Sequence, residues 1–215
     1  MKIELKQFRQ LYLTCEELCV AAAFMQVPCL YGVSGRWMKK RQGNLYKKVT
    51  QIAKGMERKN LLLPEISGEV HLQENLYDIV KGMADAEHVG RISYSSGEGL
   101  GKVFLYQKGE QIVFLEPDGK GSYHVGVLSP ATLETIYSNK IVGLQKKQEF
   151  EKQSGEWMGV LLFEKRKTFY EPLMDFAWKQ NEAETPEEAE AQLADCWECV
   201  CRFMCGSRMD GGNTE

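Results

Sequence analysis

The segment from Ser34 to Tyr137 constrains the fold of this chain more than any other part of the sequence. Its apolar spacing indicates two amphipathic helices, then four short strands in a row, then another helix. The strands are predicted at Val89–Ser95, Lys102–Gln107, Gln111–Glu116 and Tyr123–Leu128. Lys108-Gly109 and Asp118-Gly119 are typical of tight turns between strands. The pattern predicts an α+β fold in which an antiparallel β-meander packs against helices.

The first of these helices has two separate faces. Ser34 is a suitable N-cap, and Asn60 with the following Leu61-Leu62-Leu63-Pro64 ends the helix. At about 100° per residue, the apolar side chains fall within an arc of roughly 60°. They are Met38, Leu45, Val49, Ile52 and Met56, and the opposite face carries Arg36, Lys40, Lys47, Lys54 and Arg58. The second helix, predicted at Glu69–Ala84, buries Leu72, Leu76, Ile79, Val80 and Met83.

The flanking segments add further elements. Before the two helices we expect a strand at Lys2–Leu5, a helix at Gln7–Ala23 and an extended piece at Val27–Gly32. After the meander, Ser129-Pro130 begins a helix that continues to about Tyr137. A strand at Trp157–Phe163, a helix at Phe169–Trp178 and a final helix from Thr185-Pro186 to about Cys205 follow.

The length of 215 residues fits one sizeable domain. Such a chain buries roughly 70% of its unfolded surface, so it needs no metal or disulfide in order to fold. We expect a single α+β domain over residues 1–205, with a core at 1–140. Residues 206–215 are predicted to be a disordered tail.

Basic residues are concentrated in one part of the chain. Between Arg36 and Lys59 there are nine basic residues and one acidic residue, a net charge of +8, and the rest of the chain carries −11. This acidic remainder would repel nucleic acid, and the segment lacks the interleaved aromatic residues of a stacking platform. A solvated lysine face is the simpler interpretation, and an acidic protein partner or an acidic surface of the same fold is the next.

The N-terminus does not have the pattern of a signal peptide, because Glu4, Arg9, Glu16 and Glu17 interrupt its apolar stretches. The longest apolar run, Leu18–Met25, is too short to span a bilayer. The seven cysteines are an odd number and indicate reduced thiols. We therefore expect a cytoplasmic protein without stable membrane insertion.

Four of the cysteines cluster near the C-terminus, at Cys196, Cys199, Cys201 and Cys205. On a helix, Cys201 and Cys205 lie roughly opposite the first two, so one tetrahedral metal ion could not bind all four. Because the apolar arc of the same helix contains or borders these thiols, packing or partner contact is the better role.

Other candidate sites are weaker. The Ser95–Lys102 segment resembles a phosphate loop, but Ser96 stands where the first glycine is needed, Val103 replaces the hydroxyl residue, and a strand follows. His71, His88 and His124 are isolated from one another in the sequence. The residues thus predict no catalytic, cofactor-binding or metal site, and no particular partner-binding face.

The order of elements nevertheless resembles the EspG-type chaperones of type VII secretion, with a size closer to the short Gram-positive members typified by EsaE. The similarity lies in Val27-Pro28-Cys29-Leu30, the Gly55–Leu62 helix ending, the Val70–Met83 segment and the strands Lys102–Gln107 and Gln111–Glu116. It covers about residues 1–140. It is a similarity of pattern, so no functional residue is carried over.

The resemblance implies a cytoplasmic, non-enzymatic chaperone that needs no cofactor. Its partners would be secreted helical-hairpin proteins of the WXG or LXG type, which it would deliver to the secretion ATPase. The mycobacterial members contain a second, pseudo-symmetric half, of which residues 141–205 could hold only a reduced version. The final helix, rich in methionine, cysteine and aromatic residues, suits contact with such partners.

Two other functions fit the same sequence. A toxin-neutralising immunity protein would also be small, acidic and free of a catalytic site. An enzyme or ligand sensor could use a cleft between the meander and the helices.

Overall fold

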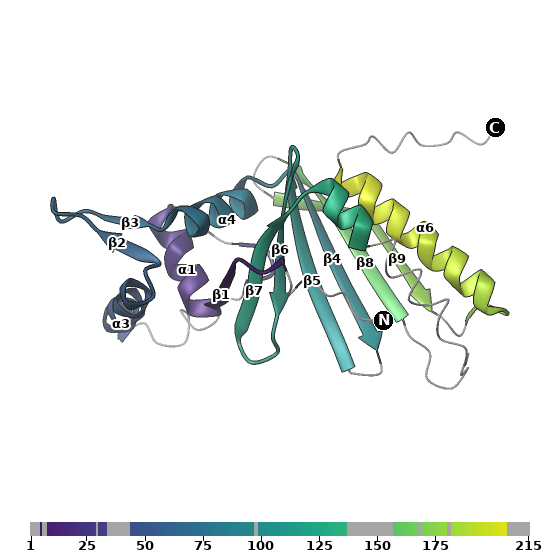
Figure 1. Ribbon diagram of the computed structural model, residues 1–215, viewed down its shortest axis with the longest axis horizontal. Coiled ribbons are helices and arrows are strands. Elements are labelled where there is room, and N and C mark those ends of the chain that lie inside the picture. The colour runs from purple at the N-terminus through teal and green to yellow at the C-terminus, as the bar shows by residue number, and fades with distance from the viewer. Residues whose placement is uncertain are drawn as a thin grey trace.

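The computed structural model describes residues 5, 8–28, 30–33, 44–96, 99–136, 157–166, 169–179 and 182–205. A seven-stranded sheet, with every neighbouring pair antiparallel, runs through the middle of the molecule (Figure 1). Its order is β1-β7-β6-β5-β4-β8-β9. The strands are β1 (Leu11–Thr14), β4 (His88–Ser96), β5 (Gly99–Lys108), β6 (Gln111–Pro117), β7 (Ser122–Leu128), β8 (Trp157–Arg166) and β9 (Phe169–Lys179).

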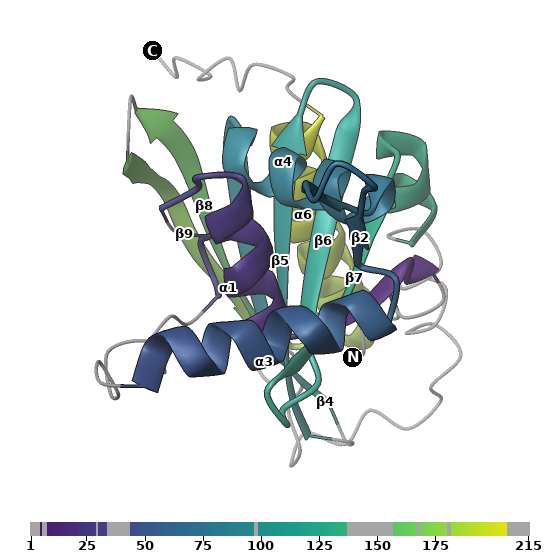
Figure 2. The same cartoon turned by 90° about the vertical axis from the view of Figure 1, so that its left-hand side faces the viewer.

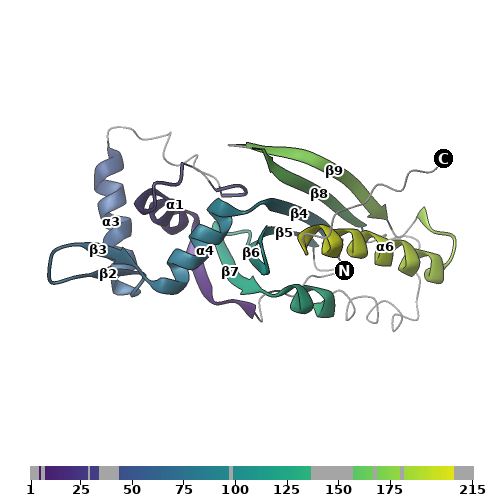
Figure 3. The same cartoon turned by 90° about the horizontal axis from the view of Figure 1, so that it is seen from above.

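Helices cover both faces of this sheet. They are α1 (Cys15–Phe24), α3 (Leu45–Arg58), α4 (Glu74–Asp85) and α6 (Pro186–Met204), and residues 130–136 are also helical. Seen from above, α6 lies on one side of the sheet and α1 and α4 on the other (Figure 3). A two-stranded hairpin of β2 (Leu62–Pro64) and β3 (Val70–Leu72) projects at the end far from α6.

Two hydrophobic cores lie on the two faces of the sheet, because alternate side chains of a strand point to opposite sides. On β5, Val103 and Leu105 point into the core under α6, whereas Phe104 and Tyr106 point into the core under α1 and α4. Both faces are buried, so residues 112–115 of β6 form an unbroken apolar run instead of alternating.

The predicted meander is confirmed, since β4, β5, β6 and β7 are consecutive antiparallel neighbours in the sheet. Their bounds agree with the predicted ones within one or two residues, except that β5 begins three residues earlier. Gly109 has a φ of +57° and Gly119 a φ of +76°, the conformations that these tight turns require. The α+β class and the C-terminal helix are confirmed as well. Thr185 caps α6 by accepting a hydrogen bond from the backbone N–H of Glu188.

The predicted helix at Gln7–Ala23 was wrong in its first half. Residues 11–14 form the edge strand β1, and α1 begins at Cys15. The signal for this boundary is a Thr-x-x-Glu capping box: the Thr14 hydroxyl accepts from the Glu17 N–H, and the Glu17 carboxylate accepts from the Thr14 N–H.

The predicted helix at Phe169–Trp178 was also wrong, because this segment is the edge strand β9. Its residues have the period of a strand: Met174, Phe176 and Trp178 point toward the core under α6, and Asp175 and Ala177 between them are exposed. The strand pairs with β8 along its full length, with one bulge at Leu162/Phe163.

The predicted helix at Glu69–Ala84 begins later than expected. Val70–Leu72 pairs with Leu62–Pro64 as a hairpin, which is not among the predicted elements. Gly68, with a φ of +87°, lies in the connecting turn. The Gln73 side chain then accepts from the Leu76 N–H and caps α4.

Some predictions fall outside the described residues. Of the expected Lys2–Leu5 strand only Leu5 is described, and it is in neither a helix nor a strand. The first turns of the helix expected from Ser34, and the tail at 206–215, are not described; α3 is described from Leu45. Asn60, with a φ of +56°, follows its C-terminus as predicted.

Trp197 tests the packing of α6 against the sheet. It is fully buried in the core that α6 covers, so Trp197→Ala should lower the free energy of unfolding by about 3–5 kcal/mol in a urea titration. Asp195→Ala, at an exposed position of the same helix, is the matched control and should change stability by less than about 0.5 kcal/mol. Equal effects of the two substitutions would contradict this packing.

Candidate partner-binding surface

The C-terminal cysteines pack into apolar surroundings. Cys201 is buried, and Cys196 and Cys199 pack partly against the core under α6. The Cys199 thiol lies 3.3 Å from the Met174 sulfur. Burial raises the pKa of Cys201 to about 12 and also raises the pKa of Cys196, Cys199 and Cys205. High pKa values disfavour the thiolate that metal binding and nucleophilic attack require.

The three histidines have separate surroundings. His88 of β4 hydrogen-bonds through Nδ1 to Gln107 Oε1 at 2.8 Å, and its ring lies 4.5 Å from that of Phe203. His124 of β7 lies against the Tyr12 ring of β1 at 5.0 Å. His71 is exposed on β3. The structure thus gives each imidazole a different local partner, as their isolation in the sequence indicated.

His71 belongs to an exposed group with Glu65 and Glu69 on the β2–β3 hairpin. Its Nε2 lies 3.1 Å from Glu65 and 3.8 Å from Glu69. Among the described residues, these three alone bring three metal-ligand atoms together, all within 4.8 Å. Exposed acidic groups commonly gather in this way without an ion, and we assign no metal to them.

The Ser95–Lys102 segment forms the ends of β4 and β5, with residues 97–98 outside the described part of the chain. A strand follows it, as the sequence predicted, so its backbone lacks the helix N-terminus of a phosphate loop. Leu100 is 82% exposed in this hairpin.

Helix α3 lies at the end of the molecule, across α1 and away from the sheet (Figure 2). Its main contacts among the described elements are with α1 and with β2 at the start of the hairpin. Met56 is therefore its one fully buried residue, and Leu45, Val49 and Ile52 stay half-buried. The predicted two-faced helix is present, but its apolar face is only partly covered.

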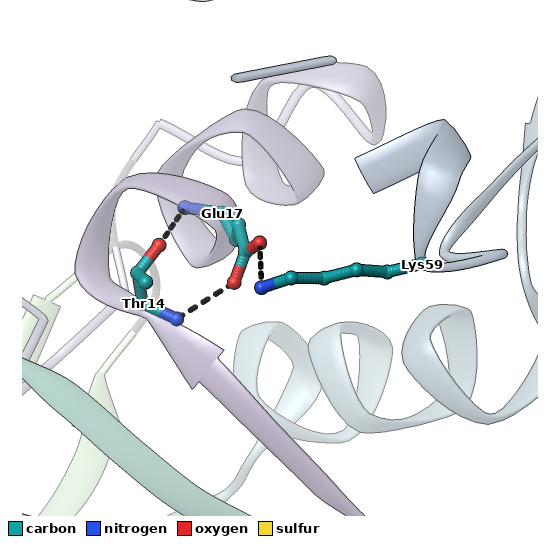
Figure 4. A network of polar contacts seen from close by, with 3 residues as sticks. All are labelled: Thr14, Glu17 and Lys59. Carbon is teal, nitrogen blue, oxygen red and sulfur yellow. Dashed lines mark hydrogen bonds and ion pairs between the residues drawn. The ribbon is translucent and has the colours of Figure 1, made fainter. Parts of the chain in front are cut away.

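Two ion pairs attach α3 to α1. Lys48 pairs with Glu16, and the Lys59 ammonium, just after α3, lies 2.6 Å from the Glu17 carboxylate. Glu17 is only 6% exposed, and its other oxygen accepts from the Thr14 N–H at 2.8 Å (Figure 4). The buried Glu17 carboxylate thus caps α1 and also pairs with Lys59, the lysine that follows α3.

Large exposed apolar side chains gather at the same end. Of eight such residues in the described part of the chain, five belong to α1, α3, α4 or the β2–β3 hairpin. These five are Phe24, Tyr46, Leu63, Ile66 and Tyr77. Tyr46 is 86% exposed on α3, and Ile66 is fully exposed in the hairpin turn. We call α3 together with the β2–β3 hairpin the distal surface.

No helix of the described residues is both long and apolar enough to cross a membrane. The chain matches no protein-family model and no curated protein.

Among solved structures, the fold is similar to that in the structure of the Mycobacterium tuberculosis type VII secretion system chaperone EspG5 in complex with a PE25–PPE41 dimer. The TM-score is 0.57 at 8% sequence identity, over 90% of this chain and 96% of that chain. The EspG-like fold that the sequence suggested is therefore confirmed, and at this identity the match shows the fold alone.

Glu17 and Glu16 offer a matched pair of substitutions for the attachment of α3. Glu17→Gln removes the buried negative charge that pairs with Lys59 and should lower the free energy of unfolding by about 1–3 kcal/mol. Glu16→Gln, whose pair with Lys48 is partly solvated, should cost less than about 1 kcal/mol in the same denaturant titration. A larger loss for Glu16→Gln would contradict the role of Glu17.

The pKa of Asp118 tests a second local contact, the hydrogen bond from Tyr12. A hydrogen bond of 2.5 Å from the Tyr12 hydroxyl is the main cause that lowers the pKa of Asp118 from 3.8 to about 2. The ionised form therefore stabilises the fold above pH 3.8, and this contribution is lost as the pH falls through 2.

In Tyr12→Phe we expect the pKa of Asp118 to rise toward 3.8, as measured by NMR titration of its carboxyl carbon. Tyr46→Phe, at an exposed tyrosine of α3, should leave it unchanged. If the pKa of Asp118 is unaltered in Tyr12→Phe, the hydrogen bond is not the cause of the lowered pKa.

Proposed function

We propose that this protein is a cytoplasmic, non-enzymatic chaperone or adaptor of type VII secretion. It binds secreted helical proteins of the WXG or LXG type and delivers them to the secretion ATPase. The single observation that carries the proposal is the similarity of its fold, over nearly all of both chains, to the structure of a type VII secretion chaperone held in complex with a PE25–PPE41 dimer.

The side chains support an interaction protein. Cys201 is buried in the core under α6 with a raised pKa, Cys196 and Cys199 pack partly against this core, and each histidine has a different local partner. Exposed apolar and basic groups share one end of the molecule. Such a mixture suits a protein partner, which buries aromatic anchors and pairs with charges around them.

We also propose that residues 1–205 form one domain. Strand β8, from the second half of the chain, pairs with β4, and β9 pairs with β8, so both extend the sheet built by the first half. This arrangement supports a reduced second half at 141–205 that continues the first core.

Co-expression tests the function. The chain should form a stable complex on gel filtration with at least one secreted helical-hairpin protein encoded in the same genome, tested as a panel. If no member of the panel forms a complex, the proposal is refuted. A complex with a toxin domain instead would identify an immunity protein.

A further inference from the structure

The outward face of α3 carries three cations in a row. Lys47, Lys54 and Arg58 are all exposed, and at about 100° per residue they lie within roughly 40° of one another. They follow the helix for about 16 Å, given a rise of 1.5 Å per residue. This stripe lies opposite Met56, the residue by which α3 is anchored.

These cations differ from the other two lysines of the region. Lys48 and Lys59 pair with α1, whereas Lys47, Lys54 and Arg58 form no ion pair with any residue that the structure describes. Glu57 is the one acidic residue of α3. A solvent-facing helix usually mixes both signs of charge at spacings of three and four residues, whereas here Glu57, three residues after Lys54, is the one carboxylate at such a spacing from the stripe.

Parts of the stripe destabilise the helix that carries it, whereas Arg58 lies in the last turn, where the helix dipole favours a cation. Lys47 lies in the first turn of α3, where the positive end of the helix dipole disfavours a cation, and this turn has no acidic residue. Asn44 makes no side-chain cap. Lys54 and Arg58, four residues apart, repel each other. An anionic partner would remove these penalties.

Apolar contacts are available beside the charges. Tyr46, 86% exposed, precedes Lys47 on α3. The hairpin projects past α3 on the side away from the sheet, and it carries Leu63 and Ile66 (Figures 1 and 3). Tyrosine and arginine are the residues most often found at the energetic centre of protein interfaces.

We propose that the distal surface binds an acidic amphipathic helix of a protein partner, with carboxylates against Lys47, Lys54 and Arg58. Where the partner is a secretion substrate, this assignment rests on the proposed function. Nucleic-acid binding typically uses about six to ten phosphate contacts, and the net charge of −11 outside Arg36–Lys59 would repel such a polyanion. A protein helix needs only a few pairs.

A defined probe tests the surface without the substrate. The probe is a synthetic 18-residue helical peptide with glutamates along one face and leucines along the other, titrated into ¹⁵N-labelled protein. It should shift amide resonances of α3, and the shifts should weaken at high salt because exposed charges are screened. Absence of shifts on α3, or equal binding of single-stranded DNA or anionic vesicles, would overturn the assignment.

A matched pair of triple variants gives the second readout. K47E/K54E/R58E should weaken peptide binding at least about tenfold, because mutated interface charges change both association and affinity. K81E/K102E/K120E makes the same charge change at exposed positions outside α3 and should bind nearly as the wild type. Circular dichroism is used to check that both variants fold. Equal weakening of peptide binding in the two variants would refute the role of α3.

The same variants separate this inference from the proposed function. If a secreted helical partner binds the wild type and K47E/K54E/R58E equally well, the function stands and the distal surface is wrong. If no such partner binds but the acidic peptide does, the surface stands and the chaperone function is wrong.

Discussion

The structure depends on a sheet that is apolar on both faces. Phe104 and Leu105, neighbours on β5, belong to different cores, so each face must be covered. Helix α6 covers one, and α1 with α4 covers the other. Helix α3 does not pack on the sheet as its main contact; it lies against α1 and the hairpin and fully buries only Met56. The basic face of α3, on the side opposite Met56, is left exposed.

Charge adds to the limited apolar burial that holds α3 in place. Glu17 is the central residue, since it caps α1 and pairs with Lys59 while almost fully removed from solvent. A buried carboxylate is costly unless it is paired and hydrogen-bonded, and here both conditions are met. The basic residues between Arg36 and Lys59 thus divide, where they are described, into those that hold α3 in place and those that face outward.

The sequence predicted the strands of the meander well because Gly109 and Gly119 mark their turns and both faces are apolar. It failed at both edges of the sheet. At β1, the capping box of Thr14 and Glu17 marks a boundary that the predicted helix crosses. At β9, Met174, Phe176 and Trp178 alternate as in a strand, whereas a helix is predicted. Of the distal surface, the sequence predicted only the two faces of α3. The attachment of α3 to α1 could not be predicted, because Lys59 and Glu17 lie 42 positions apart in the chain.

Differential lysine acetylation, read by mass spectrometry on a purified complex with a secreted helical partner, tests the central claim most directly. The account predicts that Lys47 and Lys54 become protected on binding, while Lys102 and Lys120, exposed on other elements, react as in the free protein. Protection of Lys102 or Lys120 with Lys47 and Lys54 still reactive would contradict it and place the partner elsewhere on the fold.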